Sequence, residues 1–296
     1  MPTLNVGTFT RSVLLEATLS SGAFSVRGWR VQEHPVSSSP AQFDALQRGD
    51  LDLAITNPDN VLLYSGFADN PLGRRLDLTI TTAIDRGLDL SLWARPDLAD
   101  GVIRSIGVDV PVSGFALAAF ALLERMGIDR DDVEVRALGS TPRRRVALAR
   151  SEIDVTILGA GNEILAAEHG CRRLADVTDI GPYLGAVACR MTELASGRRF
   201  AADALSDALR RTANAVLDGE HGDLIVAAAR RLLDLSATGA EQHLRVLRSD
   251  RIGLVRGGAF DRAAMQTVVE LRAGWQDRAA LEAAADTLLD GALRMP

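Results

Sequence analysis

Short hydrophobic runs, polar turns and amphipathic stretches alternate along this chain, and one block of the pattern occurs twice. Residues 31–56 recur at matched spacing as residues 133–158, with Pro40 aligned to Pro142. Each copy predicts a strand, a polar turn, a short helix and a second strand. The closing runs, LDLAI and IDVTI, are rich in branched residues, as buried parallel strands are. The pattern favours two homologous units, although ordinary α/β domains also repeat β-α-β units.

The same order of elements continues on both sides of each copy. Residues 4–8 predict a strand before the first copy, and residues 104–108 predict its counterpart before the second. A last hydrophobic run covers residues 185–190, and the chain beyond residue 200 has the spacing of amphipathic helices. We therefore expect an α/β protein with two lobes, each a mostly parallel sheet flanked by helices, and a C-terminal helical segment.

Composition narrows the class of protein. The 296 residues are 47% hydrophobic, which is enough for one large domain or two medium ones. The formal net charge is -6 and the chain has no lysine, so we expect no nucleic-acid partner. It contains no run of about 20 hydrophobic residues, so we expect no membrane span. Cys171 and Cys189 lack a metal-ligand spacing, so we expect no metal and no cofactor, and their pairing stays open.

The first residues bear on the compartment. Met1 leads within three residues into a predicted strand, without a basic and hydrophobic leader. We expect a cytoplasmic protein, either a monomer or a homodimer. A cloned mature form of a periplasmic or extracellular protein would look the same, so that alternative stays open.

Three stretches carry a resemblance to a known family: SSSPAQFDALQRGDLDLAITNPDN, RPDLADGVIRSIGVD and VSGFALAAFALLERMGI. With them the chain resembles the type II periplasmic solute-binding proteins, in particular the branch of sulfonate-, nitrate- and thiamine-pyrimidine-binding proteins. The resemblance implies two lobes that close on a ligand by hinge motion, with an ABC permease as partner if the protein is exported. Lobe one would comprise residues 1–93 and 191–296, and lobe two residues 101–187, with crossings near residues 92–100 and 187–191.

The ends of the predicted strands supply a candidate ligand site. Open α/β sheets bind ligands beyond the carboxyl ends of their strands, where helix N-termini present free N–H groups and partial positive charge. We therefore expect a small polar, anionic ligand, although each serine or threonine taken singly is also an ordinary helix cap. Arg11 would suit a carboxylate or sulfonate. The candidate residues are Thr8, Phe9, Thr10, Arg11, Ser38, Ser39, Asn57, Asp59 and Asn60 in lobe one, and Ser113, Gly114, Phe115, Ser140, Thr141, Gly161 and Asn162 in lobe two.

Asp59 is the strongest single candidate for a ligand-binding residue, because it is an acid directly after a central strand. It would accept a hydrogen bond from a ligand or act as a base, and the alternative is a cap of the following helix. We predict a small-molecule binding protein. The alternative is a cytosolic decarboxylase, lyase or isomerase on the same scaffold, with Asp59 as its catalytic residue.

Two enzymes of similar fold rely on residues that this chain does not offer in the same way. A desulfinase of this fold uses a cysteine in the cleft, and a pyrimidine synthase uses a histidine with a cysteine-rich stretch. Here Cys171 and Cys189 lie away from the predicted strand ends, and no histidine has a partner at ligand spacing. The sequence therefore leaves open whether the protein is an enzyme.

Overall fold

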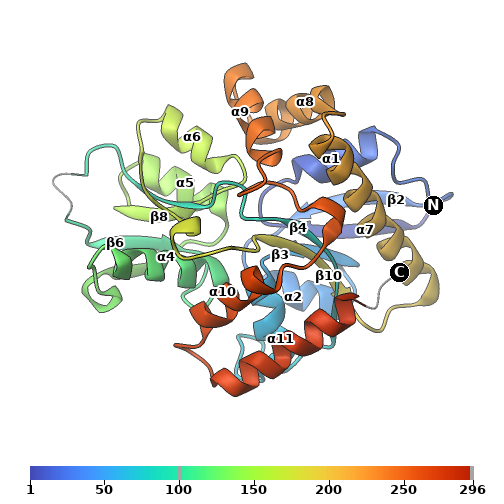
Figure 1. Cartoon of the computed structure of the whole chain (residues 1–296), viewed down its shortest axis with the longest axis horizontal. Helices are drawn as coiled ribbons and strands as arrows, with labels where there is room; N and C mark the ends of the chain where they lie inside the picture. Colours follow the sequence, from blue (N-terminus) through green and yellow to red (C-terminus); the bar gives the residue numbers. More distant parts are fainter. Residues whose placement is uncertain (99–101, 294–296) are drawn as a thin grey trace.

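The computed structural model describes residues 1–98 and 102–293, and it is built on two separate five-stranded sheets (Figure 1). We call each sheet with the helices packed on it a lobe. The first sheet has the order β2-β1-β3-β10-β4, and the second has the order β7-β6-β8-β5-β9. The strands of the first sheet are β1 (Thr3–Thr8), β2 (Arg30–Pro35), β3 (Leu53–Thr56), β4 (Leu78–Asp85) and β10 (Ala186–Met191). Those of the second are β5 (Ser91–Ala94), β6 (Ser105–Val108), β7 (Glu134–Ala137), β8 (Val155–Leu158) and β9 (Arg172–Asp176).

The two sheets are built alike, as the repeat predicted. β1 pairs in parallel with β2 and β3, and β6 pairs in parallel with β7 and β8. The aligned acids of the repeat also accept equivalent hydrogen bonds from the neighbouring strand. Asp52 accepts a hydrogen bond from the Asn5 N–H at 2.8 Å, and Asp154 accepts one from the Ser105 N–H at 3.0 Å. The predicted fold class of two α/β lobes is confirmed.

The crossings between the lobes lie earlier in the chain than predicted. β5 pairs antiparallel with β8 and β9, and β10 pairs antiparallel with β3 and β4, so the chain crosses through residues 86–90 and 177–185. Of the positions predicted as crossings, residues 92–94 and 187–191 are instead strand, and residues 99–101 lie outside the described part. The prediction missed this because β5 and β10 are buried over most of their length, so their hydrophobic pattern does not reveal which sheet they join.

The two crossings contact each other through their backbones. Gly87, Leu88 and Asp89 follow one another with φ of 104°, 46° and 64°, a left-handed turn that brings the chain out of β4. A Cβ on Gly185 of the second crossing would lie 2.2 Å from the Gly87 nitrogen, so only glycine fits there.

Helices cover both faces of each sheet (Figure 1). In the first lobe they are α1 (Val13–Ser20), α2 (Ser39–Arg48) and α3 (Pro58–Gly66), and in the second α4 (Gly114–Arg125), α5 (Thr141–Ala149) and α6 (Asn162–Glu168). The C-terminal helices are α7 (Ser196–Leu217), α8 (Gly222–Leu233), α9 (Ala237–Leu247), α10 (Arg262–Arg272) and α11 (Arg278–Leu293). α7 packs on the first sheet, whereas α9 contacts α6 and α10 contacts α4 of the second lobe.

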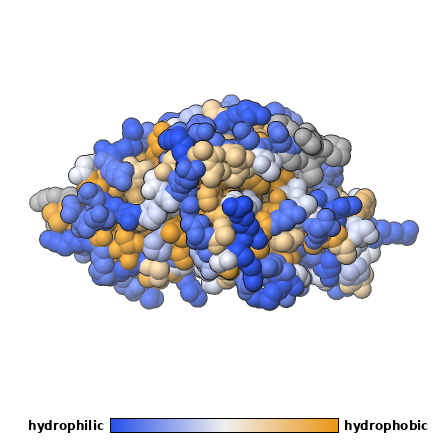
Figure 2. All heavy atoms as spheres, turned by 90° about the horizontal axis from the view of Figure 1, so that it is seen from below, coloured by the Kyte–Doolittle hydropathy of each residue, from blue (hydrophilic) through white to orange (hydrophobic). Residues whose placement is uncertain are grey.

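The hydrophobic core is shared between the lobes. One cluster of buried side chains joins Phe43 of α2 and Leu62 of α3 to Phe120 of α4, Val268 of α10 and Leu281 of α11. The outer surface on the side of α10 and α11 mixes hydrophilic and hydrophobic residues over its whole width (Figure 2). Cys171 and Cys189 are both free and buried. Within the described residues, no helix combines the length and the hydrophobicity needed to cross a bilayer.

Candidate functional site

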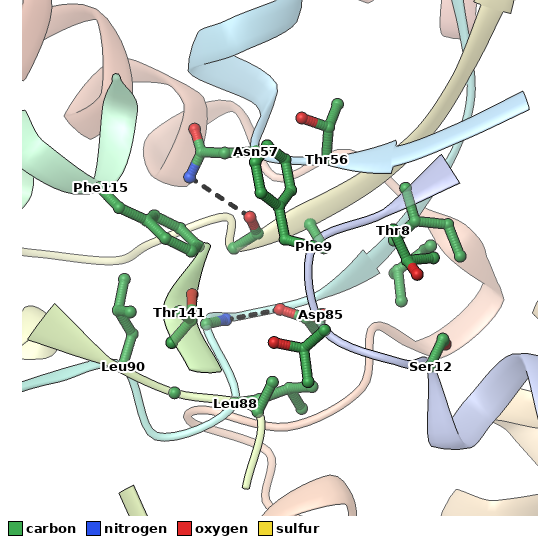
Figure 3. A pocket seen from close by; sticks show the side chains of 18 of the residues that line it. Thr8, Phe9, Ser12, Thr56, Asn57, Asp85, Leu88, Leu90, Phe115 and Thr141 are labelled. Atoms are coloured by element: carbon green, nitrogen blue, oxygen red, sulfur yellow. Dashed lines mark hydrogen bonds between the residues drawn. The ribbon is translucent and has the colours of Figure 1, made fainter. Parts of the chain in front are cut away.

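A cavity of about 130 Å³ lies between the lobes, beyond the carboxyl ends of β1, β3 and β4 on one side and of β6 and β8 on the other (Figure 3). Both crossings line it as well, through Gly87, Leu88, Leu90 and Gly185. This is the place where open α/β sheets bind ligands. In another protein a hydrophobic cavity of about 150 Å³ holds benzene, so a ligand of roughly that size fits.

Hydrophobic side chains form most of the wall. Phe9 follows β1 in the first lobe, Phe115 lies in the first turn of α4 in the second, and the two enter the cavity from opposite sides (Figure 3). Further hydrophobic side chains are contributed by Val13, Leu14, Ile55, Ile84, Leu88, Leu90, Leu247 and Leu254. A largely hydrophobic wall with a few polar groups is typical of small-molecule sites.

Nine of the residues predicted for the site line this cavity. They come from both lobes, namely Thr8, Phe9, Thr10, Arg11, Asn57, Asn60, Ser113, Phe115 and Thr141. The sequence could predict this grouping because each residue follows a strand or begins a helix at the carboxyl edge of its sheet. Whether they contact a ligand stays a prediction.

Some of these side chains also have structural partners. The Asn57 side chain caps α3 by accepting from the Asp59 N–H at 2.8 Å. Its amide nitrogen donates to the Tyr183 hydroxyl at 2.9 Å and to the Gly185 carbonyl at 3.3 Å, which ties α3 to the second crossing. Asn57 therefore fixes the crossing against the first lobe, in addition to facing the cavity.

The other seven predicted residues are not part of the cavity wall, namely Ser38, Ser39, Asp59, Gly114, Ser140, Gly161 and Asn162. Ser38 and Ser140 occupy the N-cap positions of α2 and α5, so Ser39 and Thr141 are the first helical residues and not the caps. Proline is the second residue of both helices.

Asp59 has a partner that no sequence pattern indicated. Its two carboxylate oxygens accept from Nε and Nη2 of Arg272 in α10, both at 2.5 Å, and the pair is buried with exposures of 2% and 1%. Arg272 also donates to the Val112 carbonyl of the second lobe at 2.7 Å. The expectation that Asp59 faces a ligand or acts as a base is therefore wrong, because both oxygens are bound within the protein.

Several remaining predicted residues join the lobes to each other. The Asn162 amide donates to the Thr10 hydroxyl at 3.3 Å across the cleft. A Cβ on Gly114 would lie 2.6 Å from Asn57 Oδ1, so α4 begins directly against α3. These contacts, like that of Arg272, hold the lobes close together around the cavity.

Two carboxyl groups of the cavity were missed. Asp85 is the last residue of β4, and Asp109 directly follows β6, so both stand at carboxyl ends of strands. Burial raises the pKa of Asp85 to about 7, although the hydrogen bond that Asp85 accepts from the Gly87 N–H at 2.8 Å acts to lower it. Burial also raises the pKa of Asp109, opposed mainly by the charge of Arg144. The available signal was an acid closing a hydrophobic run, as in TTAID and SIGVD.

His243 of α9 also lines the cavity, although no sequence pattern selected it. It is 2% exposed, its Nδ1 has no hydrogen-bond partner among the described residues, and burial lowers its pKa to about 4. The ring is therefore neutral at physiological pH. Only the packing of α9 over the cleft shows that this histidine belongs to the site.

The two guanidinium groups of the cavity are bound by the protein. Arg11 pairs with Glu33 at 3.7 Å, and its side chain is half-exposed. Arg144 is buried and donates to the Gly139 carbonyl at 2.5 Å and to the Thr141 and Thr156 hydroxyls, among other acceptors. Burial lowers the pKa of Arg144 to about 10, so it keeps its charge at neutral pH.

Comparison with solved structures shows the fold. The alkanesulfonate-binding protein SsuA from Xanthomonas axonopodis pv. citri, bound to MOPS, is 14% identical with a TM-score of 0.74, over 95% of this chain and 97% of SsuA. The zinc-bound ligand-binding component of an ABC-type import system from Staphylococcus aureus is 13% identical with a TM-score of 0.70, over 93% and 92%. The fold resemblance inferred from the sequence is thereby confirmed.

A further solved structure of the same fold is DszB, as a cysteine-to-serine variant in complex with biphenyl-2-sulfinic acid. It is 16% identical with a TM-score of 0.64, over 99% of both chains. No family model matches this chain, and no curated protein matches it. At these identities the likeness establishes the architecture and not the ligand or the activity.

Proposed function

We propose that this chain, which has the fold of the substrate-binding components of ABC importers, is a binding protein for one small molecule held between its lobes. The observation that carries the proposal is the cavity itself, lined from both lobes at the carboxyl edges of two equivalent sheets. Solved structures of the same fold bind small ligands, among them the MOPS of one SsuA.

The wall of the cavity bears on the kind of ligand. The sequence predicted a small polar anion, because helix N-termini meet at this edge. Phe9, Phe115 and the aliphatic side chains around them support a ligand with a hydrophobic body instead. A polar head would then meet the few polar groups at the strand ends.

Ligand entry requires the lobes to separate, and the chain has a suitable place for that motion. The crossings at residues 86–90 and 177–185 are where the backbone passes between the sheets. Opening by rotation about these segments would break the cross-cleft bond from Asn162 to Thr10 while leaving each sheet intact. An ABC permease is the partner we propose if the protein is exported.

The experiment is native mass spectrometry of the protein purified from its host without denaturation. A single small molecule retained in a 1:1 complex is the expected result. Ala186→Phe fills the cavity from β10 and should abolish retention, whereas the equal enlargement Ala195→Phe, at an exposed position, should not. If the protein retains nothing, and no metabolite of a host extract raises its melting temperature, the binding function is refuted.

A second candidate function is catalysis. It is favoured by Asp85 and His243, a carboxyl with a pKa of about 7 and a neutral imidazole lining one mostly hydrophobic cavity. Groups of this kind are suited to proton transfer, as in a decarboxylase, lyase or isomerase. The test is to incubate the protein with host extract and follow metabolites over time. Loss of a metabolite that continues past one equivalent, and stops with Asp85→Asn, would make the protein an enzyme.

A further inference from the structure

Two helix N-termini near the cavity, those of α1 and α2, already hold carboxylates of the chain itself. At the start of α1, the Ser12 N–H donates to Glu33 at 2.6 Å. At the start of α2, the Ser39 N–H donates to Asp109 of the other lobe at 3.3 Å. An anionic ligand would have to displace these groups or share the N–H donors with them. At these two helix N-termini the attraction for anions is therefore satisfied within the protein.

The two guanidinium groups of the cavity also have partners in the protein, a carboxylate at 3.7 Å for Arg11 and neutral acceptors for Arg144. Arg11 pairs with Glu33, and the bonds of Arg144 to the second lobe hold its guanidinium in place. The two carboxyl groups of the cavity differ from the guanidinium groups in this respect. In the described part of the chain Asp85 forms no salt bridge, and Oδ1 of Asp109 is buried without any hydrogen-bond partner. Among the described residues the cavity therefore has a carboxyl group without an ion pair, Asp85, and an oxygen without a hydrogen bond, Oδ1 of Asp109.

A buried acceptor without a partner is costly, and a ligand that brings a donor relieves this cost. A protonated amine supplies the positive charge that Asp85 lacks, in a charge-assisted bond strengthened by the hydrophobic surroundings, and Oδ1 of Asp109, unpartnered in the described part of the chain, is a second acceptor in the same cavity. Phe9 and Phe115 suit the hydrophobic part of such a molecule and also the face-on approach of a cation.

We infer that the cavity takes a small primary amine, whose ammonium group meets the Asp85 carboxylate and whose hydrophobic body lies between Phe9 and Phe115. This inference rests on the proposed binding function and names its ligand class. Figure 3 shows Asp85 below Phe9 and Phe115 in this view, near Thr141 of the second lobe and Leu88 of the first crossing.

The protonation of Asp85 gives the inference a signature in pH. Because its pKa is about 7, the empty cavity holds the acid protonated at pH 5.5 and mostly ionised at pH 8. An alkylammonium ion stays charged throughout this range, so the affinity should rise with pH. His243 stays neutral over the same range. The other charged groups around Asp85 are its neighbour Arg86 and the cavity residues Arg11, Asp109 and Arg144.

The test is calorimetric titration with three probes that share one ring: benzylamine, benzyl alcohol and benzenesulfonate. We expect benzylamine to bind most tightly at pH 8 and to lose about tenfold or more in affinity at pH 5.5. Asp85→Asn should weaken benzylamine by ~10- to 100-fold at pH 8, the value of a hydrogen bond to a charged group, and abolish the pH dependence. Glu163→Gln is the matched control, since Glu163 is a buried acid with a pKa of about 8 that lies outside the cavity wall.

The outcomes separate this inference from the function on which it rests. Tighter binding of benzenesulfonate than of benzylamine overturns it, as does unchanged benzylamine affinity in Asp85→Asn. If no probe binds and the ligand retained from the host carries no amine, the inference is wrong while the binding function stands. If no probe binds and nothing is retained from the host, both are wrong.

Discussion

Removing the carboxylate of Asp59 should destabilise the protein strongly. Arg272 is 1% exposed, and both of its bonds to Asp59 are 2.5 Å long. In Asp59→Ala the guanidinium keeps its bond to the Val112 carbonyl but loses its counter-charge in a site without access to water. Stranding one partner of a buried ion pair costs about 3–5 kcal/mol. At a few degrees per kcal/mol, the melting temperature should fall by roughly 10 °C.

The chain offers a matched control in Glu270 and Arg278. This pair also has two hydrogen bonds, both at 2.6 Å, but its side chains are 48% and 52% exposed. Glu270→Ala should therefore change the urea midpoint by only a small fraction of the Asp59→Ala effect, because water replaces the lost partner. The double variant Asp59→Leu with Arg272→Met should recover most of the loss, since a hydrophobic pair strands no charge.

Urea denaturation of the four proteins, followed by circular dichroism, measures these differences. Equal losses for Asp59→Ala and Glu270→Ala would refute the reasoning, because burial would then make no difference to the pair. A double variant as unstable as Asp59→Ala would also count against it.

Three further predictions concern pH, packing and location. Burial raises the pKa of Glu163 to about 8, so the stability that the protonated acid contributes is complete below pH 4.5 and is lost as the pH rises through 8. The melting temperature of Glu163→Gln should therefore rise relative to that of the native protein between pH 5 and pH 8.5. A difference between the two melting temperatures that stays constant with pH would contradict this. Gly114→Ala should cost about 1–3 kcal/mol and admit protease at the cleft, because its Cβ would overlap Asn57 and Asp59, whereas Gly197→Ala, with its nearest neighbour at 3.9 Å, should do neither. The cytoplasmic location stays a prediction from the sequence, and recovery of the native protein in a periplasmic or secreted fraction of its host would contradict it.

The sequence predicted positions better than it predicted chemistry. Aligned positions of the repeat occupy equivalent places, as Gln42 and Arg144 show. Gln42 donates to the Ile55 carbonyl, and Arg144 donates to the aligned Ile157 carbonyl. One position therefore braces a strand end in both lobes, with a neutral side chain in one and a charged one in the other. The repeat aligns these two positions, but it predicts neither their hydrogen bonds nor the difference in their charge.

Contacts between distant segments explain most of what was missed. Asp59 and Arg272 are 213 positions apart, and nothing in the spacing of either helix indicates the other. His243 reaches the cavity because α9 packs against α6 of the opposite lobe. Asp85 and Asp109 were open to prediction, since each closes a hydrophobic run, but the polar helix starts offered the more familiar signal of a ligand site.

The nature of the ligand was beyond the sequence for a related reason. A helix N-terminus stabilises a nearby anion by about 0.3–1 kcal/mol, whichever molecule supplies it. Asp109 reaches the start of α2 from the other lobe, and Glu33 reaches the start of α1 from β2. A carboxylate fixed in the chain loses no translational freedom on binding there, whereas a free anion loses several kcal/mol, so the internal group prevails. Two of the helix ends that suggest an anion site in the sequence thus already hold a carboxylate in the folded protein, and the cavity beside them contains an acceptor without a partner among the described residues, Oδ1 of Asp109.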